Sequence, residues 1–119
     1  MENQKDRAAL ARMLMRLFDV WDLTLQEQLC LLGYSPKSLH VIRRYRDGAS
    51  LTNRPGLLKR VGLLLGIHKN LRLIFPQNRD LAYRWITTSN AYFNQQRPLD
   101  LMLKGEEGML AVYQYLESV

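Results

Sequence analysis

The sequence has little cysteine and little histidine for its 119 residues, and this scarcity excludes two kinds of site. A single thiol, Cys30, cannot form an internal disulfide, and a chain with only one cysteine suits a reducing compartment. We predict that Cys30 lies on a short buried helix and is inert. The histidines, His40 and His68, lie far apart and leave no set of ligands at metal-binding spacing. We therefore expect no metal and no cofactor.

Long hydrophobic runs are also missing. No stretch approaches the ~18 consecutive apolar residues of a membrane-spanning helix, and the N-terminal segment lacks the apolar core and cleavage site of a signal peptide. We expect a soluble cytoplasmic protein with no membrane partner. The phosphate-binding glycine loop, the G-x-S-x-G elbow and the H-E-x-x-H zinc motif are absent from the sequence as well. No residue is therefore predicted to be catalytic, and an enzyme is not expected.

Acidic residues are scarce where basic residues gather. The chain has 17 Lys and Arg against 11 Asp and Glu, which gives a net charge of +6. The whole excess lies in residues 35–60, where Asp47 is the only acid, and the rest of the chain is neutral. A local basic patch of this kind favours an anionic partner, with nucleic acid first and a membrane surface second.

Apolar residues recur at helical spacing along nearly the whole chain, and no segment alternates as a strand would. The longest predicted helix begins near Pro55 and ends near Phe75. Its apolar stripe is predicted to contain Leu58, Val61, Leu65, His68, Leu71 and Phe75. We predict an all-α fold with a helix-turn-helix N-terminal part in residues 1–75, which includes this long connecting helix, and a small helical C-terminal part in residues 76–119.

Two short helices around a glycine-containing turn are predicted at the start of the basic patch. Thr24 and Glu27 have the spacing of a capping box that opens the first helix, and Gly33 is suited to end it. Ser35 and Pro36 predict the N-cap and the first position of the second helix. A short helix, a turn and a basic helix form the arrangement of a helix-turn-helix DNA-binding motif.

The second of these helices is predicted to dock through Leu39 and Ile42 and to present its opposite, polar side to the major groove of DNA. The predicted DNA-binding residues are Ser35, Lys37, Ser38, His40, Arg43 and Arg44. The basic residues predicted to contact phosphates or solvent are Arg46, Arg54, Lys59 and Arg60. Recognition helices must lie about 34 Å apart to reach successive major grooves, so we expect a homodimer on operator DNA. The alternative is an ordinary basic helix exposed to solvent.

The C-terminal third is neutral and carries aromatic side chains of the kind favoured at protein interfaces. We predict that Trp85 and Phe93 lie in the core of this part, and that Tyr115 lies at its surface or in an interface. The composition therefore indicates a second partner, which is a protein.

A composite motif occupies residues 81–116, with the sequence LAYRWITTSNAYFNQQRPLDLMLKGEEGMLAVYQYL. Its tryptophan helix, its turn of T-P-N-x-x-F type, its P-L-D-L helix and its final V-x-x-Y-L helix resemble the toxin-binding domain of Xre/MbcA/ParS-type antitoxins. The Xre-type DNA-binding region of the same proteins is similar to two upstream segments, LLGYSPKSLHVIRRYRDG and LLLGIHKNLRLIFP. Two departures lie in one loop, since Ser89 replaces the usual proline and Gln95-Gln96 replace a common glycine.

The resemblance implies a non-enzymatic antitoxin whose partner is a RES-domain toxin that acts on NAD. In such pairs the C-terminal region of the antitoxin covers the entrance of the toxin's active site, and the N-terminal part represses the shared operon. Carried onto this sequence, the implied toxin-binding residues are Met102, Leu103, Lys104, Tyr113, Tyr115, Leu116, Glu117, Ser118 and Val119. Two alternatives remain open: a helix-turn-helix transcriptional regulator whose C-terminal part only dimerises, and an antitoxin that has lost DNA binding.

Overall fold

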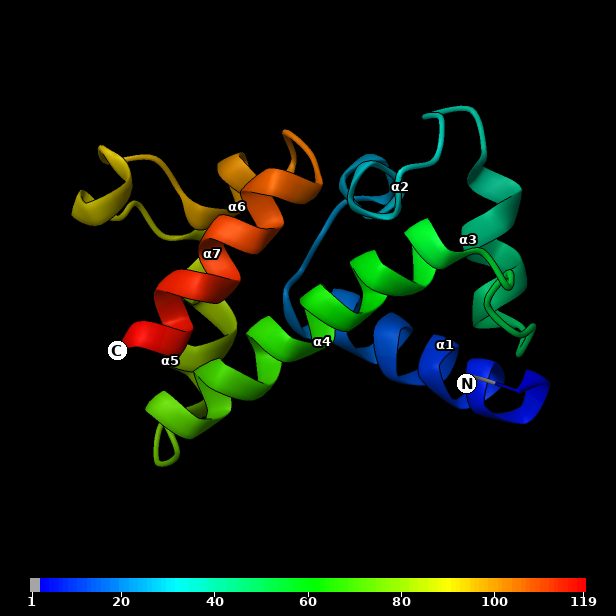
Figure 1. The fold of residues 1–119 in the computed structure, drawn as a ribbon, viewed down its shortest axis with the longest axis horizontal. Helices are drawn as coiled ribbons and strands as arrows, with labels where there is room; N and C mark the ends of the chain where they lie inside the picture. Colours follow the sequence, from blue (N-terminus) through cyan, green and yellow to red (C-terminus); the bar gives the residue numbers. More distant parts are fainter. Residues whose placement is uncertain (1–2) are drawn as a thin grey trace. The chain divides into compact units, whose positions relative to one another are not determined.

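The computed structural model describes residues 3–119, and every regular element in that range is helical (Figure 1). The α-helices are α1 (Gln4–Val20), α2 (Leu25–Leu32), α3 (Leu39–Arg46), α4 (Pro55–Ile74), α5 (Arg79–Arg84), α6 (Pro98–Met102) and α7 (Glu106–Ser118). Two 3-10 turns, η1 (Trp85–Thr87) and η2 (Ala91–Phe93), lie between α5 and α6. The predicted all-α class is confirmed.

The chain forms two compact units that divide inside α4. Unit 1 extends to Gly62, and unit 2 contains residues 63–119. The sequence-based division after residue 75 instead assigns the whole of α4 to the N-terminal part, and as a statement about domains it stays a prediction. The predicted length of this helix agrees with the structure, because α4 begins at Pro55 and ends one residue before Phe75.

Helix α2 of unit 1 has the ends that the sequence predicts. The Thr24 hydroxyl accepts a hydrogen bond from the Glu27 backbone N–H at 3.1 Å, and the Glu27 carboxylate accepts one from the Thr24 N–H at 2.9 Å. Gly33 then ends the helix with a φ of 80°, a conformation that costs a residue with a side chain about 1 kcal/mol or more. Cys30, however, is exposed on this helix, so the prediction that it is buried was wrong.

Helix α3 begins later than predicted. Ser35 and Pro36 do not start the helix, because the Ser35 hydroxyl accepts from the Lys37 N–H at 3.2 Å and the Ser35 carbonyl accepts from the Ser38 N–H at 3.0 Å. These bonds close a local turn, and the helix starts at Leu39. The connection between α2 and α3 therefore spans residues 33–38 rather than a three-residue turn.

The core of unit 1 lies where α3 packs against α1 and α2. Its fully buried side chains include Phe18, Trp21, Leu29, Leu32, Ile42 and Leu51. Helix α3 contributes Val41, Ile42 and Tyr45 to this core. Leu39, predicted to dock with Ile42, is instead 41% exposed at the first position of the helix.

Unit 2 is built on the close approach of α6 and α7. A Cβ added to Gly108 of α7 would lie 2.6 Å from the carbonyl carbon of Leu101 in α6, so only glycine fits. Similarly, a Cβ on Gly66 of α4 would lie 2.8 Å from the Tyr113 ring, which packs on that glycine. The buried side chains of this unit include Leu64, Ile67, Leu71, Ile86, Leu99, Met102, Met109, Val112 and Leu116.

The buried stripe of α4 agrees with the prediction at Val61 and Leu71 but differs from it by one residue at other positions. Leu57 and Leu64 are buried, whereas the predicted Leu58 and Leu65 are half-buried. Leucines stand at both neighbouring positions, so the sequence pattern alone does not distinguish the two stripes.

The segment of residues 88–97 folds into a compact turn of its own. Asn90 and Gln96 form an isolated antiparallel bridge, and the Asn90 side chain accepts a hydrogen bond from the Tyr92 N–H at 2.9 Å. Asn94 and Gln95 have φ angles of 59° and 66°. Gln95 therefore occupies the left-handed region that favours glycine, which is the residue common at this point in the resembling antitoxins.

Candidate functional site

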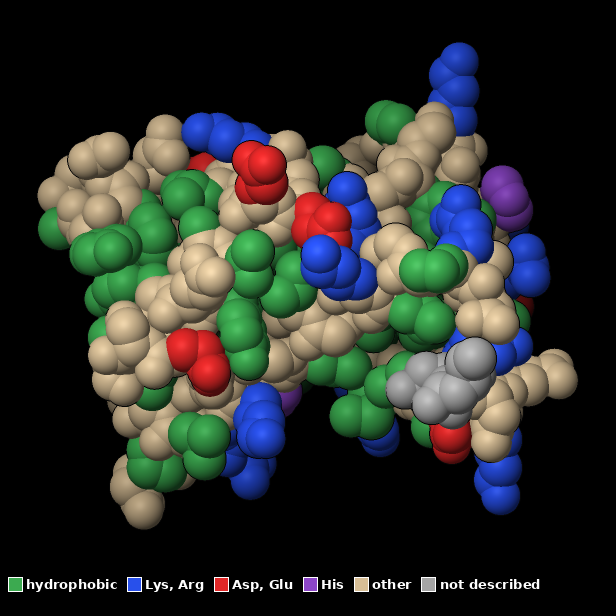
Figure 2. Space-filling model, viewed as in Figure 1, with side chains coloured by type: hydrophobic (Ala, Val, Ile, Leu, Met, Phe, Trp, Pro, Cys, Tyr) green, Lys and Arg blue, Asp and Glu red, His purple; other side chains and the backbone are tan. Residues whose placement is uncertain are grey.

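The polar face of α3 is open to solvent as predicted. His40, Arg43 and Arg44 recur at helical spacing on the side opposite the buried Val41 and Tyr45. Of the six predicted DNA-binding residues, Ser38 is half-buried and the others are exposed. Figure 2 shows several Lys and Arg side chains and one histidine along the side where α3 lies in Figure 1.

The cations of this face are not neutralised by the protein itself. Within residues 3–119, no carboxylate forms an ion pair with Lys37, Arg43 or Arg44. Their exposed guanidinium and ammonium groups can therefore donate hydrogen bonds to phosphates or base edges without first breaking an internal ion pair.

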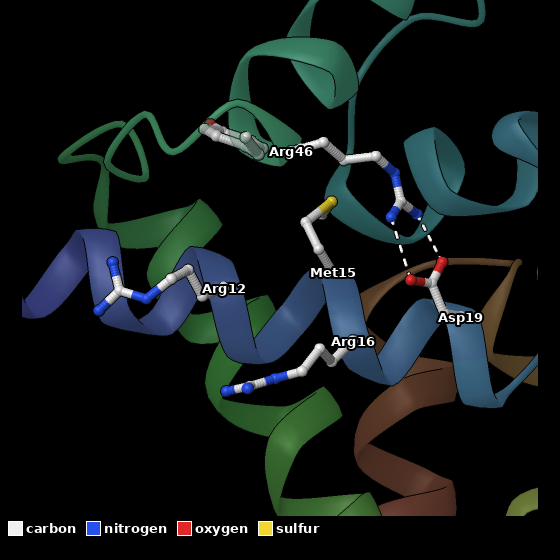
Figure 3. A pocket seen from close by; sticks show the side chains of 6 residues that line it. Arg12, Met15, Arg16, Asp19 and Arg46 are labelled. Carbon is white, nitrogen blue, oxygen red and sulfur yellow. Dashed lines mark hydrogen bonds and ion pairs between the residues drawn. The ribbon is translucent and has the colours of Figure 1, made fainter.

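Arg46, in contrast, forms an ion pair within unit 1. Its guanidinium group forms two parallel hydrogen bonds with the Asp19 carboxylate, at 2.9 and 3.2 Å (Figure 3). It also donates to the Gln28 amide oxygen at 3.5 Å, so it links α3 to both α1 and α2. Arg46 is exposed to solvent, as one part of its prediction allows, but its guanidinium group already binds a carboxylate of the same chain.

Arg54 and Arg60 also have internal partners. The Arg60 guanidinium donates to the carbonyl of Leu31 at 3.2 Å and would lie 3.2 Å from a Cβ on Gly33, so it packs under the end of α2. The Arg54 guanidinium lies 5.2 Å from the centre of the Tyr34 ring, a cation-π geometry. Both arginines hold the α2–α3 connection in place, a role that sequence analysis missed.

A chain of hydroxyl groups reinforces the same connection. The Tyr34 and Tyr45 hydroxyls are 3.0 Å apart, and the Tyr45 hydroxyl is 3.3 Å from that of Thr52. Burial raises the pKa of Tyr45. Burial also acts to raise the pKa of Tyr34, but its hydrogen bonds with Tyr45, Thr52 and Arg54 outweigh burial, and the net shift is downward. No spacing in the sequence signals this contact between three separate segments.

A shallow cavity of about 260 Å³ lies beside the Arg46–Asp19 pair, between α1 and α3 (Figure 3). Arg12 and Arg16, one turn apart on α1, line it, and both point away from that ion pair. Each is exposed, and neither has a carboxylate partner within residues 3–119. They add basic charge to unit 1 outside the region that the sequence singles out.

The residues implied to bind a toxin divide between core and surface. Met102 and Leu116 are 0% and 3% exposed, so their side chains support the core of unit 2 and are not presented to a partner. Three are half-buried: Leu103, Tyr113 and Tyr115. Four are exposed: Lys104, Glu117, Ser118 and Val119. The end of α7 is held by the Asn70 amide of α4, which donates to the Glu117 carboxylate at 2.8 Å.

Four aromatic rings gather where the segment 88–97 meets α7. This aromatic cluster consists of Trp85, Tyr92, Phe93 and Tyr115. The Tyr115 ring lies 4.2 Å from Tyr92, 5.3 Å from Phe93 and 6.1 Å from Trp85, measured between ring centres. Phe93 is buried as predicted, whereas Trp85 is half-buried rather than in the core. Tyr92 is 66% exposed. It is one of the C-terminal aromatic residues that the sequence marks as favoured at interfaces, but its exposure was not predicted, because its segment has no helical periodicity.

Comparison with known proteins agrees with unit 2 as a binding module. The protein-family model for the antitoxin Xre/MbcA/ParS C-terminal toxin-binding domain matches residues 70–119. The uncharacterized protein y4oB of Sinorhizobium fredii is 32% identical over 104 residues, which cover 87% of this chain and 78% of y4oB. The chain belongs to the Xre/MbcA/ParS antitoxin family. A toxin is therefore a partner of this antitoxin, and the matched residues lie entirely within unit 2.

Outside the aromatic cluster, unit 2 of the antitoxin contains a half-buried histidine. His68 of α4 stacks on Tyr83 of α5, with ring centres 6.0 Å apart, and Arg72 donates to the Tyr83 hydroxyl at 3.3 Å. The Nδ1 atom of His68 is buried and has no hydrogen-bond partner among the described residues. Burial lowers the pKa of His68, and the positive charge of Arg72 lowers it further. This position at the boundary of the core agrees with the prediction for His68.

This lowered pKa makes the stability of the antitoxin depend on pH. Below pH 6.5, the ordinary value for histidine, the unfolded chain takes up a proton at His68 more readily than the folded chain. We therefore expect the free energy of unfolding to fall between about pH 7.5 and about pH 5.5. His68→Gln should make this fall smaller, which thermal unfolding at a series of pH values measures. His40→Gln, on the exposed face of α3, is the control and should keep the wild-type fall; equal curves for all three proteins would refute the prediction.

The described part of the antitoxin holds neither a candidate metal site nor a candidate membrane span. Residues 3–119 contain no group of three or more His, Cys, Asp or Glu side chains placed to hold a metal ion. No helix in the same range has the length and apolar character needed to cross a membrane.

Proposed function

We propose that this antitoxin binds and neutralises a RES-domain, NAD-consuming toxin by covering the toxin's active site with its C-terminal region. The observation that carries the proposal is the match of residues 70–119 to a toxin-binding domain, together with the exposed end of α7 in the same unit. Glu117, Ser118 and Val119 are exposed there, and Val119 is 67% exposed despite its apolar side chain. They are the side chains proposed to reach the active-site entrance. The antitoxin itself acts in the cytoplasm and catalyses no reaction.

The second part of the proposal assigns repression of the antitoxin's own operon to unit 1. Arg43 and Arg44 of α3 support it, because they are exposed, have no carboxylate partner within residues 3–119, and can release counterions on binding phosphate, which supplies a large share of the affinity for DNA. Two copies of the chain bind the operator as a homodimer, since one recognition helix reaches only one major groove. Ser35, Lys37 and Ser38 act from the turn before α3, and the residues that act from the helix are His40, Arg43 and Arg44.

The toxin-binding part is tested by shortening the chain after Leu116. Removal of residues 117–119 leaves the core of unit 2 intact, whereas removal of all of α7 would delete the buried Met109 and Val112. The shortened antitoxin is co-expressed in a bacterial host with the product of the neighbouring gene, which the proposal expects to be a RES-domain toxin, and growth and cellular NAD are followed. We expect the full chain to preserve both, and the shortened chain to bind at least about tenfold more weakly and to lose protection.

The shortened chain also loses the hydrogen bond between Glu117 and Asn70, and Asn70→Ala serves as the matched control. This variant removes the bond but keeps residues 117–119, so it should still protect the host. Full protection by the shortened chain would refute the assignment of the α7 end. If the full chain binds no neighbouring toxin but binds its promoter, the protein is a regulator whose C-terminal part only dimerises. Neutralisation without promoter binding would identify an antitoxin that has lost DNA binding.

A further inference from the structure

The aromatic cluster of unit 2 has an unusual feature for a surface tyrosine. Tyr92 is 66% exposed, yet its ring is fixed between neighbours, with ring centres 4.2 Å from Tyr115 and 5.0 Å from Phe93. Large aromatic side chains that are ordered but open to solvent are the typical anchors of protein interfaces, because little conformational entropy is lost when they bind. Figure 2 shows hydrophobic side chains gathered on the side of unit 2 where this segment lies in Figure 1.

The backbone that presents Tyr92 is held in an uncommon conformation. Asn94 and Gln95 are consecutive non-glycine residues with positive φ, each of which costs about 1 kcal/mol or more. Bonds to Asn90 compensate, since its carbonyl accepts from the Gln95 N–H at 2.9 Å and its side chain accepts from the Tyr92 N–H at 2.9 Å. The segment is thus preorganised around the exposed ring. Segments whose strained backbone is held in place by hydrogen bonds of this kind occur more often at binding sites than elsewhere.

The cluster is continuous with the surface that the proposed function assigns to the toxin. Tyr115 lies one helical turn before the exposed Ser118 and Val119, and residues three and four apart share one side of a helix. The cluster itself carries no charge. The nearby charges of Arg97 and Asp100 neutralise one another at 2.7 Å, and hydrogen bonds from Arg97 hold the pKa of Asp100 below its ordinary value. The partner surface that fits this area is therefore apolar.

We propose that Tyr92, supported by Tyr115, is the anchor residue that inserts into an apolar pocket of the toxin beside the active-site entrance covered by the end of α7. The inference rests on the proposed neutralisation of a toxin and adds a second contact to it. The end of α7 blocks the active site, whereas Tyr92 supplies affinity and selects the toxin whose pocket accepts a ring.

The test measures binding of the full-length antitoxin to the purified protein encoded beside its gene, by titration calorimetry. We expect Tyr92→Ala to raise Kd at least about tenfold and Tyr92→Phe to leave it within about twofold, because the ring makes the contact. Leu73→Ala is the matched control and should bind as the wild type does. Leu73 is 68% exposed in the same unit, on the end of α4 that lies away from the segment 88–97 in Figure 1.

A second measurement does not depend on how the alanine variant folds. A photo-reactive benzoylphenylalanine at position 92 should cross-link to the toxin, and the same group at position 73 should not. Unchanged affinity of Tyr92→Ala, or no cross-link from position 92 while the wild type binds, would overturn this inference and leave the proposed neutralisation standing. No binding by the wild type would overturn both. Loss of self-association in Tyr92→Ala, with toxin affinity unchanged, would assign the cluster to a contact between two copies of the chain.

Discussion

Gly108→Ala is expected to destabilise unit 2 by about 3 kcal/mol or more, which is a large part of the stability of a small domain. The added methyl group would lie 2.6 Å from the carbonyl carbon of Leu101 and meet the carbonyl oxygen as well. Both are backbone atoms, so α6 and α7 must separate to make room, and the buried Met102 and Met109 would lose their packing. Urea unfolding measures the loss, and residue-resolved hydrogen exchange should place it in α6 and α7.

Gly62→Ala is the matched control for this substitution. Gly62 lies inside α4, and a Cβ there would meet no atom within 4 Å. Alanine is a better helix former than glycine, so this variant should gain about 0.5–1 kcal/mol. Equal stabilities for Gly108→Ala and the wild type would show that α6 and α7 do not depend on this contact.

Loss of Lys37 and Arg44, each proposed to contact either a guanine base or a phosphate, should have the largest effect on DNA binding. We expect Lys37→Ala combined with Arg44→Ala to weaken binding to the antitoxin's own promoter about 100-fold, because each direct contact contributes about 1–3 kcal/mol. Both side chains are exposed and unpaired with any carboxylate in residues 3–119, so their removal should leave Tm nearly unchanged. Mobility shifts at several salt concentrations measure the effect, and the salt dependence should weaken by about one unit of slope for each of the two side chains that contacts a phosphate.

The control for this double variant changes the net charge equally in unit 2. Arg79 and Arg84 are exposed on α5, and replacement of both by alanine also removes two positive charges. If affinity depended only on net charge, the two double variants would weaken binding alike. Promoter binding that survives Lys37→Ala with Arg44→Ala would refute the assignment of α3 as the recognition helix.

Local signals in the sequence predicted the helices well. The Thr24–Glu27 capping box, the stop at Gly33 and the proline that opens α4 each operate within a few residues of one another, so the sequence contains all the partners. Ser35 was the exception, although its bond is equally local. Its hydroxyl can cap a helix or close a turn on Lys37, and the pattern of residue types does not distinguish these outcomes.

Which of two neighbouring apolar rows is buried, and which aromatic rings are exposed, depends on tertiary contacts that the sequence pattern does not show. Leu57 and Leu64 are buried in α4 instead of the predicted Leu58 and Leu65, because packing partners select one of two equally apolar stripes. Similarly, Tyr92 is exposed because the turn of residues 88–97 directs it outward, and that turn depends on a bridge between Asn90 and Gln96.

The sequence by itself determined the all-α class, the limits of α2 and α4, and a family resemblance that the comparisons bear out for residues 70–119. It also located the net charge of +6 in one segment. Only the tertiary structure decided which of those cations are paired, since Arg46 binds Asp19 on another helix while Arg44 has no carboxylate partner within residues 3–119. The physical reason is that helix caps are satisfied by near neighbours along the chain, whereas an ion pair or a buried contact is satisfied by residues that only folding brings together.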